Sequence, residues 1–156
     1  MCFKFGDASP LFSTIGLQFG SAMPSSSPQQ VPCLGLTTSF VDSAINLVCF
    51  ADYWSTRRRA DRFEKEMSVW AAGLSLRRPV IIRGSTTQLY YGIGTGFLYA
   101  GSDISPKSDF DLIVHGHGGV EIDVTDSLIG ILEIKYVLAG NGDYLNIALG
   151  VVTNLR

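Results

Sequence analysis

Charged and histidine residues recur at every second position in part of the C-terminal half of this chain. The segment 109–123 reads DFDLIVHGHGGVEID, and a β-strand turns successive side chains to opposite faces of its sheet. One face of such a strand is polar and the other apolar, with Ile113 and Gly119 as exceptions on the polar face. With two residues of the next candidate strand, the polar set is Asp109, Asp111, His115, His117, Glu121, Asp123, Glu133 and Lys135.

The chemistry that this polar set offers is first of all ion pairing. Glu133 and Lys135 share one strand face, and Glu121 lies on the neighbouring strand across a short turn. Opposite charges that face one another across a sheet pair when they leave water. We therefore predict a structural cluster of ion pairs, with a binding site or a functional relay as the alternative.

His115 and His117 add a second possibility, because their imidazoles would lie on one strand face roughly 7 Å apart. With Glu121 as a third ligand they could hold a metal ion. Two histidines and one loosely placed carboxylate are a weak ligand set. We therefore expect a polar interior or rim at these residues, and no metal or other cofactor.

A second charged group lies upstream, in TRRRADRFEKE at 56–66. Its basic cluster is Arg57, Arg58, Arg59 and Arg62, with Lys65 nearby, and the same run also holds Asp61, Glu64 and Glu66. A mixed-charge run of this kind is typical of a solvated loop, while clustered arginines can also pair with phosphate groups.

The elements that must position these groups are strands with the same two-faced pattern. The candidate strands are Leu11–Gly20, Cys33–Phe40, Ser43–Trp54, Met67–Leu76, Gln88–Ala100, Asp109–Asp123, Leu128–Leu138 and Tyr144–Leu155. Their connections fall into two sets: 21–32, 55–66, 101–108 and 139–143 at one end, and 41–42, 77–87 and 124–127 at the other. The connection 77–87 is long and apolar for a turn, so the alternative is that it extends the neighbouring strands. Pro106 is expected to stop strand pairing. An even number of strands with both termini on one side suits a membrane barrel.

Residues 41–72 are open to a second interpretation. As a hairpin, this region turns Asp52 inward and places Tyr53 and Trp54 in an aromatic girdle beside the charged loop. As a helix, it contains no Gly or Pro and could be capped by Ser39 with Asp42. The helical alternative predicts a soluble α+β protein in which helix 41–72 packs on an antiparallel sheet of residues 79–155.

Composition favours the barrel and excludes some functions. Hydrophobic residues make up 46% of the 156 residues and charged ones 17%, yet no apolar run approaches the roughly 20 residues of a membrane helix. The net charge of −2 argues against nucleic acid as a partner. We expect one domain over 1–156, least defined over 1–40.

The three cysteines, Cys2, Cys33 and Cys49, are expected to be free thiols rather than to form a Cys33–Cys49 disulfide.

Several motifs in the last 70 or so residues belong to a known pattern. They are Tyr91-Gly92-Ile93-Gly94, Gly119-Val120-Glu121, Thr125-Asp126-Ser127, and Glu133 with Tyr136. In these the sequence resembles the small, eight-stranded outer-membrane β-barrel proteins of bacteria. The resemblance implies an all-β, antiparallel up-and-down transmembrane barrel that is a monomer in the outer membrane.

Such barrels usually end in an aromatic residue, whereas this sequence ends Leu155-Arg156. Its first residues also lack a signal-peptide pattern, so we expect an export signal that was removed or a native start elsewhere.

Two enzyme hypotheses accompany this interpretation. Some barrels of the resembling kind hydrolyse lipid with Ser, His and an acid on the outer wall, but here the histidines fall on the inward face. Gly101-Ser102 followed by Asp109-Phe110-Asp111 resembles the nucleotidyltransferase signature, although with a gap of only six residues, and it fits the helical alternative better. We assign no catalytic residue and expect a structural, adhesive or small-ligand-binding role. The expected partners are the lipid bilayer and, through the basic cluster, lipopolysaccharide.

Overall fold

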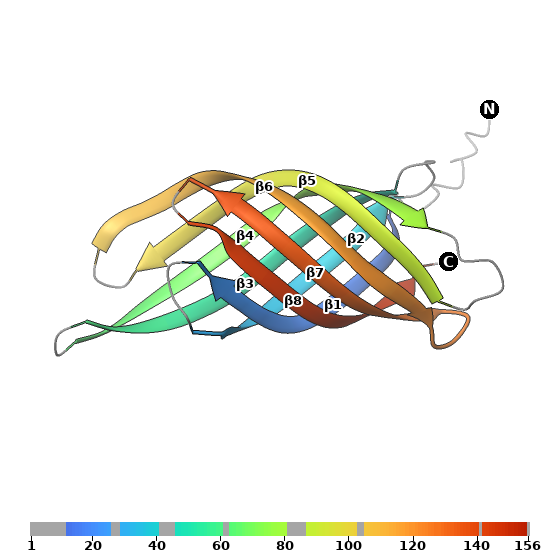
Figure 1. The fold of residues 1–156 in the computed structure, drawn as a ribbon, viewed down its shortest axis with the longest axis horizontal. Coiled ribbons are helices and arrows are strands. Elements are labelled where there is room, and N and C mark those ends of the chain that lie inside the picture. Colours follow the sequence, from blue (N-terminus) through green and yellow to red (C-terminus); the bar gives the residue numbers. More distant parts are fainter. Residues whose placement is uncertain are drawn as a thin grey trace, which may run out of the picture.

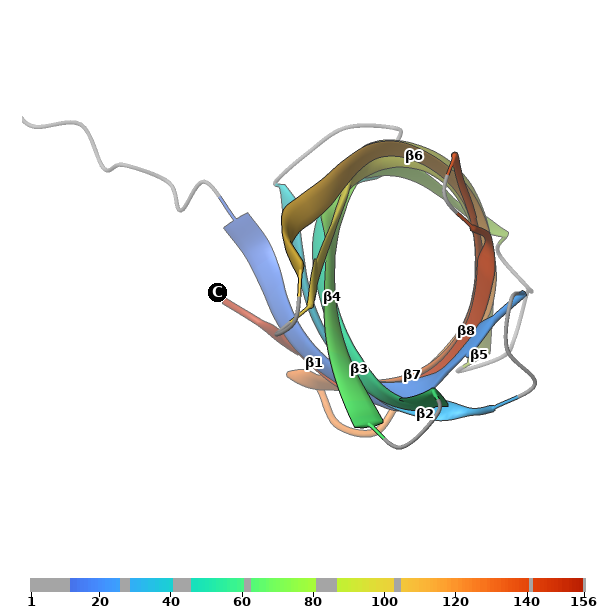
Figure 2. The same ribbon diagram turned by 90° about the vertical axis from the view of Figure 1, so that its left-hand side faces the viewer.

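Eight antiparallel strands close into a barrel in sequence order. The computed structural model describes residues 12–25, 29–40, 46–60, 63–80, 87–102, 105–140 and 142–155. The strands are β1 (Phe12–Pro24), β2 (Val31–Phe40), β3 (Asn46–Ala60), β4 (Phe63–Val80), β5 (Thr87–Ser102), β6 (Ser105–Asp123), β7 (Leu128–Ala139) and β8 (Tyr144–Asn154). Pairing of β1 with β8 closes the sheet, as the view along the barrel shows (Figure 2). The predicted all-β, eight-stranded, up-and-down barrel is confirmed.

The two ends of the barrel differ. β1 begins and β8 ends at the same end, which we call the turn end, and the hairpins β3–β4 and β5–β6 project at the opposite, hairpin end (Figure 1). The turn end includes the predicted Thr125-Asp126-Ser127 turn, where the amides of Val124 and Thr125 donate to the Leu128 carbonyl at 2.9 and 3.1 Å. At the hairpin end, Gly142 turns the chain between β7 and β8 with a φ of +139° that favours glycine.

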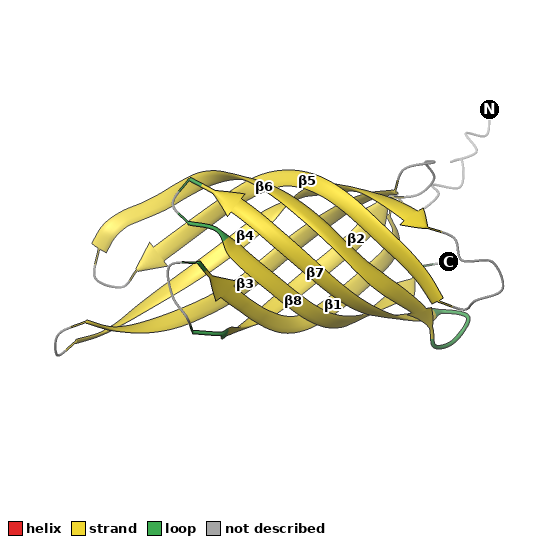
Figure 3. Ribbon diagram, viewed as in Figure 1, coloured by secondary structure: helices red, strands yellow, loops and turns green. Residues whose placement is uncertain are grey.

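The alternative helix over 41–72 is wrong, because its described residues form β3 and β4 (Figure 3). Alternate residues of β3, among them Phe50, Asp52 and Trp54, are buried in the barrel, which a strand allows and a helix does not. Asp52 thus points inward as predicted. On the outer wall Tyr53 packs against Trp70, at 4.5 Å between ring centroids. Trp54 is turned inward and is no girdle residue.

Among the described residues, no helix is long and apolar enough to cross a membrane.

Strands at the hairpin end are longer than predicted. β3 and β4 stay paired as far as Ala60 and Phe63, so most of the predicted loop 55–66 is strand. Their backbone register sets Arg57 opposite Glu66 and Arg59 opposite Glu64.

The predicted loop 101–108 is shorter as well, since β5 and β6 pair again at Ser102 and Ser105. Pro106 therefore lies within β6, and the prediction that it stops strand pairing is wrong. The β5–β6 register shifts between Ala100 and Ser102, opposite the segment that contains Pro106, and an irregularity of this kind tolerates proline. At the turn end, β4 continues to Val80, so the first residues of the predicted connection 77–87 are strand too.

The two faces of the wall are sharply different in exposure. On β6, Ile113 and His115 are 0% and 1% exposed, while their neighbours Leu112 and Val114 are 67% and 50% exposed. Inside the barrel, buried apolar residues gather around Phe50, Trp54 and Tyr144. The buried charged residues lie beside this apolar cluster and form the candidate site.

Candidate functional site

The buried charges meet at Glu133 on β7. Its Oε2 accepts a hydrogen bond from the Tyr90 hydroxyl at 2.9 Å and from Nη2 of Arg77 at 3.2 Å. Its Oε1 lies 3.8 Å from Nζ of Lys135. Glu133 is 3% exposed, so it depends on these partners to remain charged.

Two further carboxylates extend the network to other strands. Nη1 of Arg77 donates to Oε1 of Glu121 at 2.7 Å, and Nζ of Lys135 donates to Oδ2 of Asp52 at 2.7 Å. The charges therefore alternate in the order Glu121, Arg77, Glu133, Lys135, Asp52, which we call the ion-pair chain. Because these residues come from β6, β4, β7 and β3, the chain links strands that are distant in sequence.

Aromatic rings cover both cations of the ion-pair chain. The Arg77 guanidinium lies 4.0 Å from the centroid of Tyr90, and Nζ of Lys135 lies 4.2 Å from the centroid of Phe50. Cation–π contacts are strongest where water is excluded, as it is here. These rings add to the stabilisation of charges that have left water.

The two histidines lie in the same buried layer. Nε2 of His115 and Oγ of Ser75 are 2.6 Å apart, and Nδ1 of His117 is 3.6 Å from Oε2 of Glu133. On β5, Gly92 pairs with His117 and Gly94 with His115. A Cβ atom at either glycine would collide with the imidazole opposite it, so glycine at these positions lets the rings lie against the wall.

The predicted polar set is only partly brought together. His115, His117, Glu133 and Lys135 are buried and Glu121 is half-buried beside them, whereas Asp109 and Asp123 are exposed and Asp111 is half-buried. Asp109 and Asp123 lie near opposite ends of β6, and a strand rises about 3.3 Å per residue. The shared face of the strand is therefore too long for one cluster.

The structure does not fit three functions considered for these polar residues: a metal site, a lipid hydrolase and a nucleotidyltransferase. Glu121, the third ligand of the suggested metal site, is bonded to Arg77, and the described residues contain no group of three or more His, Cys, Asp or Glu placed to hold a metal ion. The Ser75–His115 pair is buried in the lumen, away from the outer wall where the lipid-hydrolase hypothesis needs it. The segment before Asp109 and Asp111 is a strand, so the helix that the nucleotidyltransferase hypothesis requires is missing from the described chain.

Sequence reasoning missed several partners in the cluster. The sequence prediction placed Arg77 in a connection. In the structure, buried Ser75 and Arg77 alternate with exposed Leu74 and Leu76 along β4. That alternation was the signal that could have found it. Tyr90 belongs to a run of aromatic and glycine residues that reads as apolar. Its buried hydroxyl group was therefore not predicted to join a charged cluster.

The basic cluster lies mostly in a strand and not in a loop. Arg57, Arg58 and Arg59 belong to the projecting part of β3, while Arg62 lies outside the described residues. Of the cysteines, Cys33 is buried and Cys49 half-buried, and both are free thiols as expected; Cys2 lies outside the described residues.

The ion-pair chain and the apolar cluster together fill the middle of the barrel. On the turn-end side a polar cavity of about 190 Å³ has Arg77 and Glu121 in its wall. On the hairpin-end side a mainly apolar cavity of about 140 Å³ is lined by Trp54, Leu98 and Tyr144. Packed side chains lie between the two, as expected for a barrel of eight strands.

Known structures share this architecture. The chain is similar to Neisserial surface protein A (NspA), with a TM-score of 0.73 and 12% identity over 92% of this chain and 96% of that chain. It is similar to Ail, the attachment invasion locus protein of Yersinia pestis, crystallised with the heparin analogue sucrose octasulfate (TM-score 0.63, 9% identity, 92% and 97% covered). It is also similar to the N-terminal β-barrel domain of Pseudomonas aeruginosa OprF (TM-score 0.59, 11% identity, 92% and 98% covered).

These likenesses concern the fold. This chain has the fold of the eight-stranded outer-membrane β-barrels, and the resemblance found in the sequence is confirmed at that level. No protein-family model matches the sequence, and no curated protein is significantly similar to it.

Proposed function

We propose that this protein spans a bacterial outer membrane as a monomer, with its hairpin end outside the cell. The observation that carries the proposal is the apolar outer wall. Large hydrophobic side chains on β1, β2 and β4–β8 are exposed, among them Phe19, Leu36, Leu74, Phe97, Leu112, Leu132 and Leu149. In water a belt of this extent is an aggregation surface. In lipid it is the anchor, since the closed sheet satisfies its own backbone hydrogen bonds.

The proposed role is structural or adhesive rather than transport. The ion-pair chain and the apolar cluster fill the lumen of the barrel, which supports a barrel without an open channel. The β3–β4 and β5–β6 hairpins project beyond the rest of the barrel (Figure 1). They are the surface that the barrel would present to the exterior.

Reconstitution in dye-loaded phospholipid vesicles tests this role. We expect the protein to float with the vesicles, to resist extraction at alkaline pH and to leave the trapped dye inside. Protein that stays in the aqueous fraction contradicts the membrane location. Dye release by inserted protein contradicts the filled lumen.

We further propose that the basic cluster contacts lipopolysaccharide. The backbone of Arg57–Arg59 lies in the projecting hairpin, and guanidinium groups bind phosphate through paired hydrogen bonds. Replacing Arg57, Arg58 and Arg59 together by Gln should weaken binding to vesicles that contain lipopolysaccharide, and the difference should shrink at high salt. The control is Arg83→Gln, which changes an arginine outside the basic cluster, between β4 and β5 in the sequence. Equal loss in both variants would reject a local phosphate site.

Small-ligand binding is a second candidate, favoured by the cavity of about 140 Å³ at the hairpin end. Its lining combines Trp54 and Leu98 with the carboxylates Asp109 and Asp143, which suits a small aromatic ammonium compound. Phenethylamine should therefore raise the unfolding temperature of the wild type but not of Asp109→Asn. No shift in the wild type would argue against this cavity as a site for such ligands.

A further inference from the structure

The apolar belt is interrupted where two glycines of β6 face outward. Gly116 and Gly118 occupy the face that carries Leu112 and Val114 earlier in the strand. A Cβ atom at Gly116 would meet nothing within 4 Å, and one at Gly118 would make only an ordinary contact with the Tyr90 carbonyl. The outer wall is therefore hollow at these two positions, and packing does not require glycine at Gly116.

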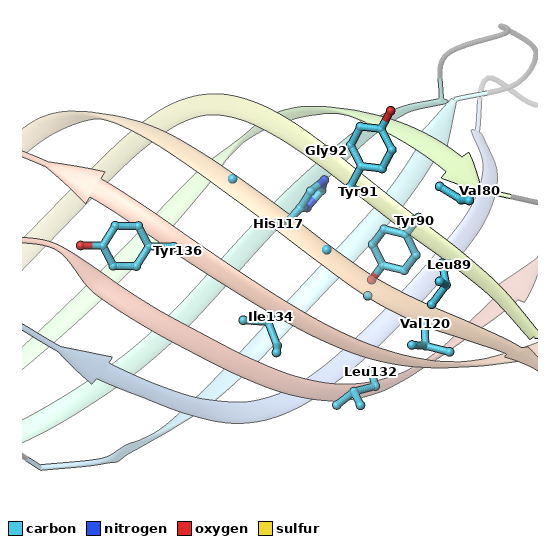
Figure 4. A pocket seen from close by; sticks show the side chains of 13 residues that line it. Val80, Leu89, Tyr90, Tyr91, Gly92, His117, Val120, Leu132, Ile134 and Tyr136 are labelled. Carbon is cyan, nitrogen blue, oxygen red and sulfur yellow. The ribbon is translucent and has the colours of Figure 1, made fainter.

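Larger side chains on the neighbouring strands make this hollow a groove (Figure 4). Gly118 lies between Tyr91 of β5 and Ile134 of β7, and Gly116 pairs with Tyr136 of β7. With Val80, Leu89, Val120 and Leu132, these residues line a groove of about 730 Å³. We call it the β6 groove.

The position of the β6 groove identifies its occupant. It belongs to the belt that lipid covers in the proposed function, and its apolar lining offers water few partners. A flexible acyl chain can follow the floor left by Gly116 and Gly118. A second copy of this chain is a poorer occupant, because lipid provides no hydrophobic driving force for apolar protein surfaces to associate.

A cation lies beside the groove, near the turn end of β4. Arg78 is exposed, pairs with Tyr91 in the β4–β5 register, and lies two residues before Val80 on the same outward face. An arginine near the end of a membrane strand can extend to the headgroup level and bind a phosphate. The groove thus offers both an apolar track and a group of the right charge for a phospholipid.

We propose that the β6 groove binds one phospholipid of the turn-end leaflet, with an acyl chain over Gly116 and Gly118 and its phosphate on Arg78. This inference rests on the proposed membrane location. It goes beyond that proposal, because it assigns a lipid site to one face of the barrel.

The test counts the phospholipids that the full-length protein retains. The protein is inserted into vesicles of phosphatidylethanolamine and phosphatidylglycerol, extracted into mild detergent and weighed by native mass spectrometry. The wild type should retain one phospholipid. Gly116→Leu, which fills the groove, should lower that retention about tenfold, and Arg78→Gln should lower it roughly tenfold through loss of the charged hydrogen bond.

Two further variants guard against misfolding and general surface effects. Gly118→Val fills the same groove from the next outward position and should repeat the loss. Ala72→Leu adds a similar side chain to the outer wall of β4, away from the groove, and should retain lipid as the wild type does.

Three results would overturn the inference: equal retention by the wild type and Gly116→Leu, equal loss in Ala72→Leu, or a wild-type dimer that Gly116→Leu abolishes. Each sample is first checked for vesicle insertion by flotation. A wild type that does not insert contradicts the proposed function. A wild type that inserts and retains no phospholipid contradicts only the lipid site.

Discussion

Glu133 and Lys135 show how single residues hold this barrel together from within. Each carries a charge into a layer that is nearly closed to water, and each meets its counterion on another strand, Arg77 for Glu133 and Asp52 for Lys135. A buried pair of this kind adds little compared with a well-packed apolar pair, but removing one partner leaves an uncompensated charge. The ion-pair chain therefore makes the fold intolerant of single changes.

The Lys135–Asp52 pair provides the sharpest test at this scale. Lys135→Met should lower the free energy of unfolding by about 3–5 kcal/mol, because Asp52 then stays buried without its cation. Urea titration in phospholipid vesicles, followed by tryptophan fluorescence, measures the change. The double variant Asp52→Asn/Lys135→Met should lose clearly less than the sum of the single variants. Additive losses would show that the two side chains do not interact.

Gly94 and Gly116 form a matched pair of glycines on adjacent strands. A methyl group at Gly94 would collide with the His115 ring and the Leu74 carbonyl, while one at Gly116 meets open space. Gly94→Ala should therefore cost about 1–3 kcal/mol, and Gly116→Ala should stay within about 0.5 kcal/mol of the wild type. The same urea titration compares them. A similar cost for both would mean that His115 does not lie over Gly94.

At the scale of elements, local alternation was enough to find the strands but not their ends. The pattern of β6, with Phe110 and Leu112 outward and His115 and His117 inward, was readable directly from the sequence. The ends of β3 and β4 depend on how far the two strands pair with each other, which is as far as Ala60 and Phe63, and a single strand's pattern does not contain that information. Arg77 was missed for a different reason: the predicted strand ended at Leu76, although the alternation of buried and exposed residues continues to Arg77.

Depth along a strand should set the effect of a charge on the outer wall. Leu149 lies near the middle of β8 and is 65% exposed, whereas Leu155 follows the end of that strand. In lipid, Leu149→Arg should lower the unfolding free energy by about 2–4 kcal/mol, and Leu155→Arg by about 0–1 kcal/mol. Unfolding in vesicles measures both. Equal costs would mean that Leu149 does not lie deeper in lipid than Leu155.

At the scale of the whole molecule, closure of the sheet is the feature that local sequence patterns predict least well. β1 was among the weakest candidate strands, yet it pairs with β8 from Thr14–Asn154 to Pro24–Tyr144. That contact joins the first and last strands, and only the even strand count and the resemblance to eight-stranded barrels suggested it beforehand. The interior cluster was partly predictable because Glu133 and Lys135 alternate on one strand. The inward direction of Asp52 was predicted too, but its pairing with Lys135 and that of Arg77 with Glu133 emerged only from the closed barrel.

Electrophoresis of the refolded protein tests the central claim, a closed barrel seated in lipid. The full chain is refolded into phospholipid vesicles and run in dodecyl sulfate with and without boiling. We predict that the unboiled sample migrates faster, as a compact barrel that resists the detergent, and that boiling converts it to the slower unfolded band. A single band in both lanes, from protein that stays soluble without lipid, would contradict the account.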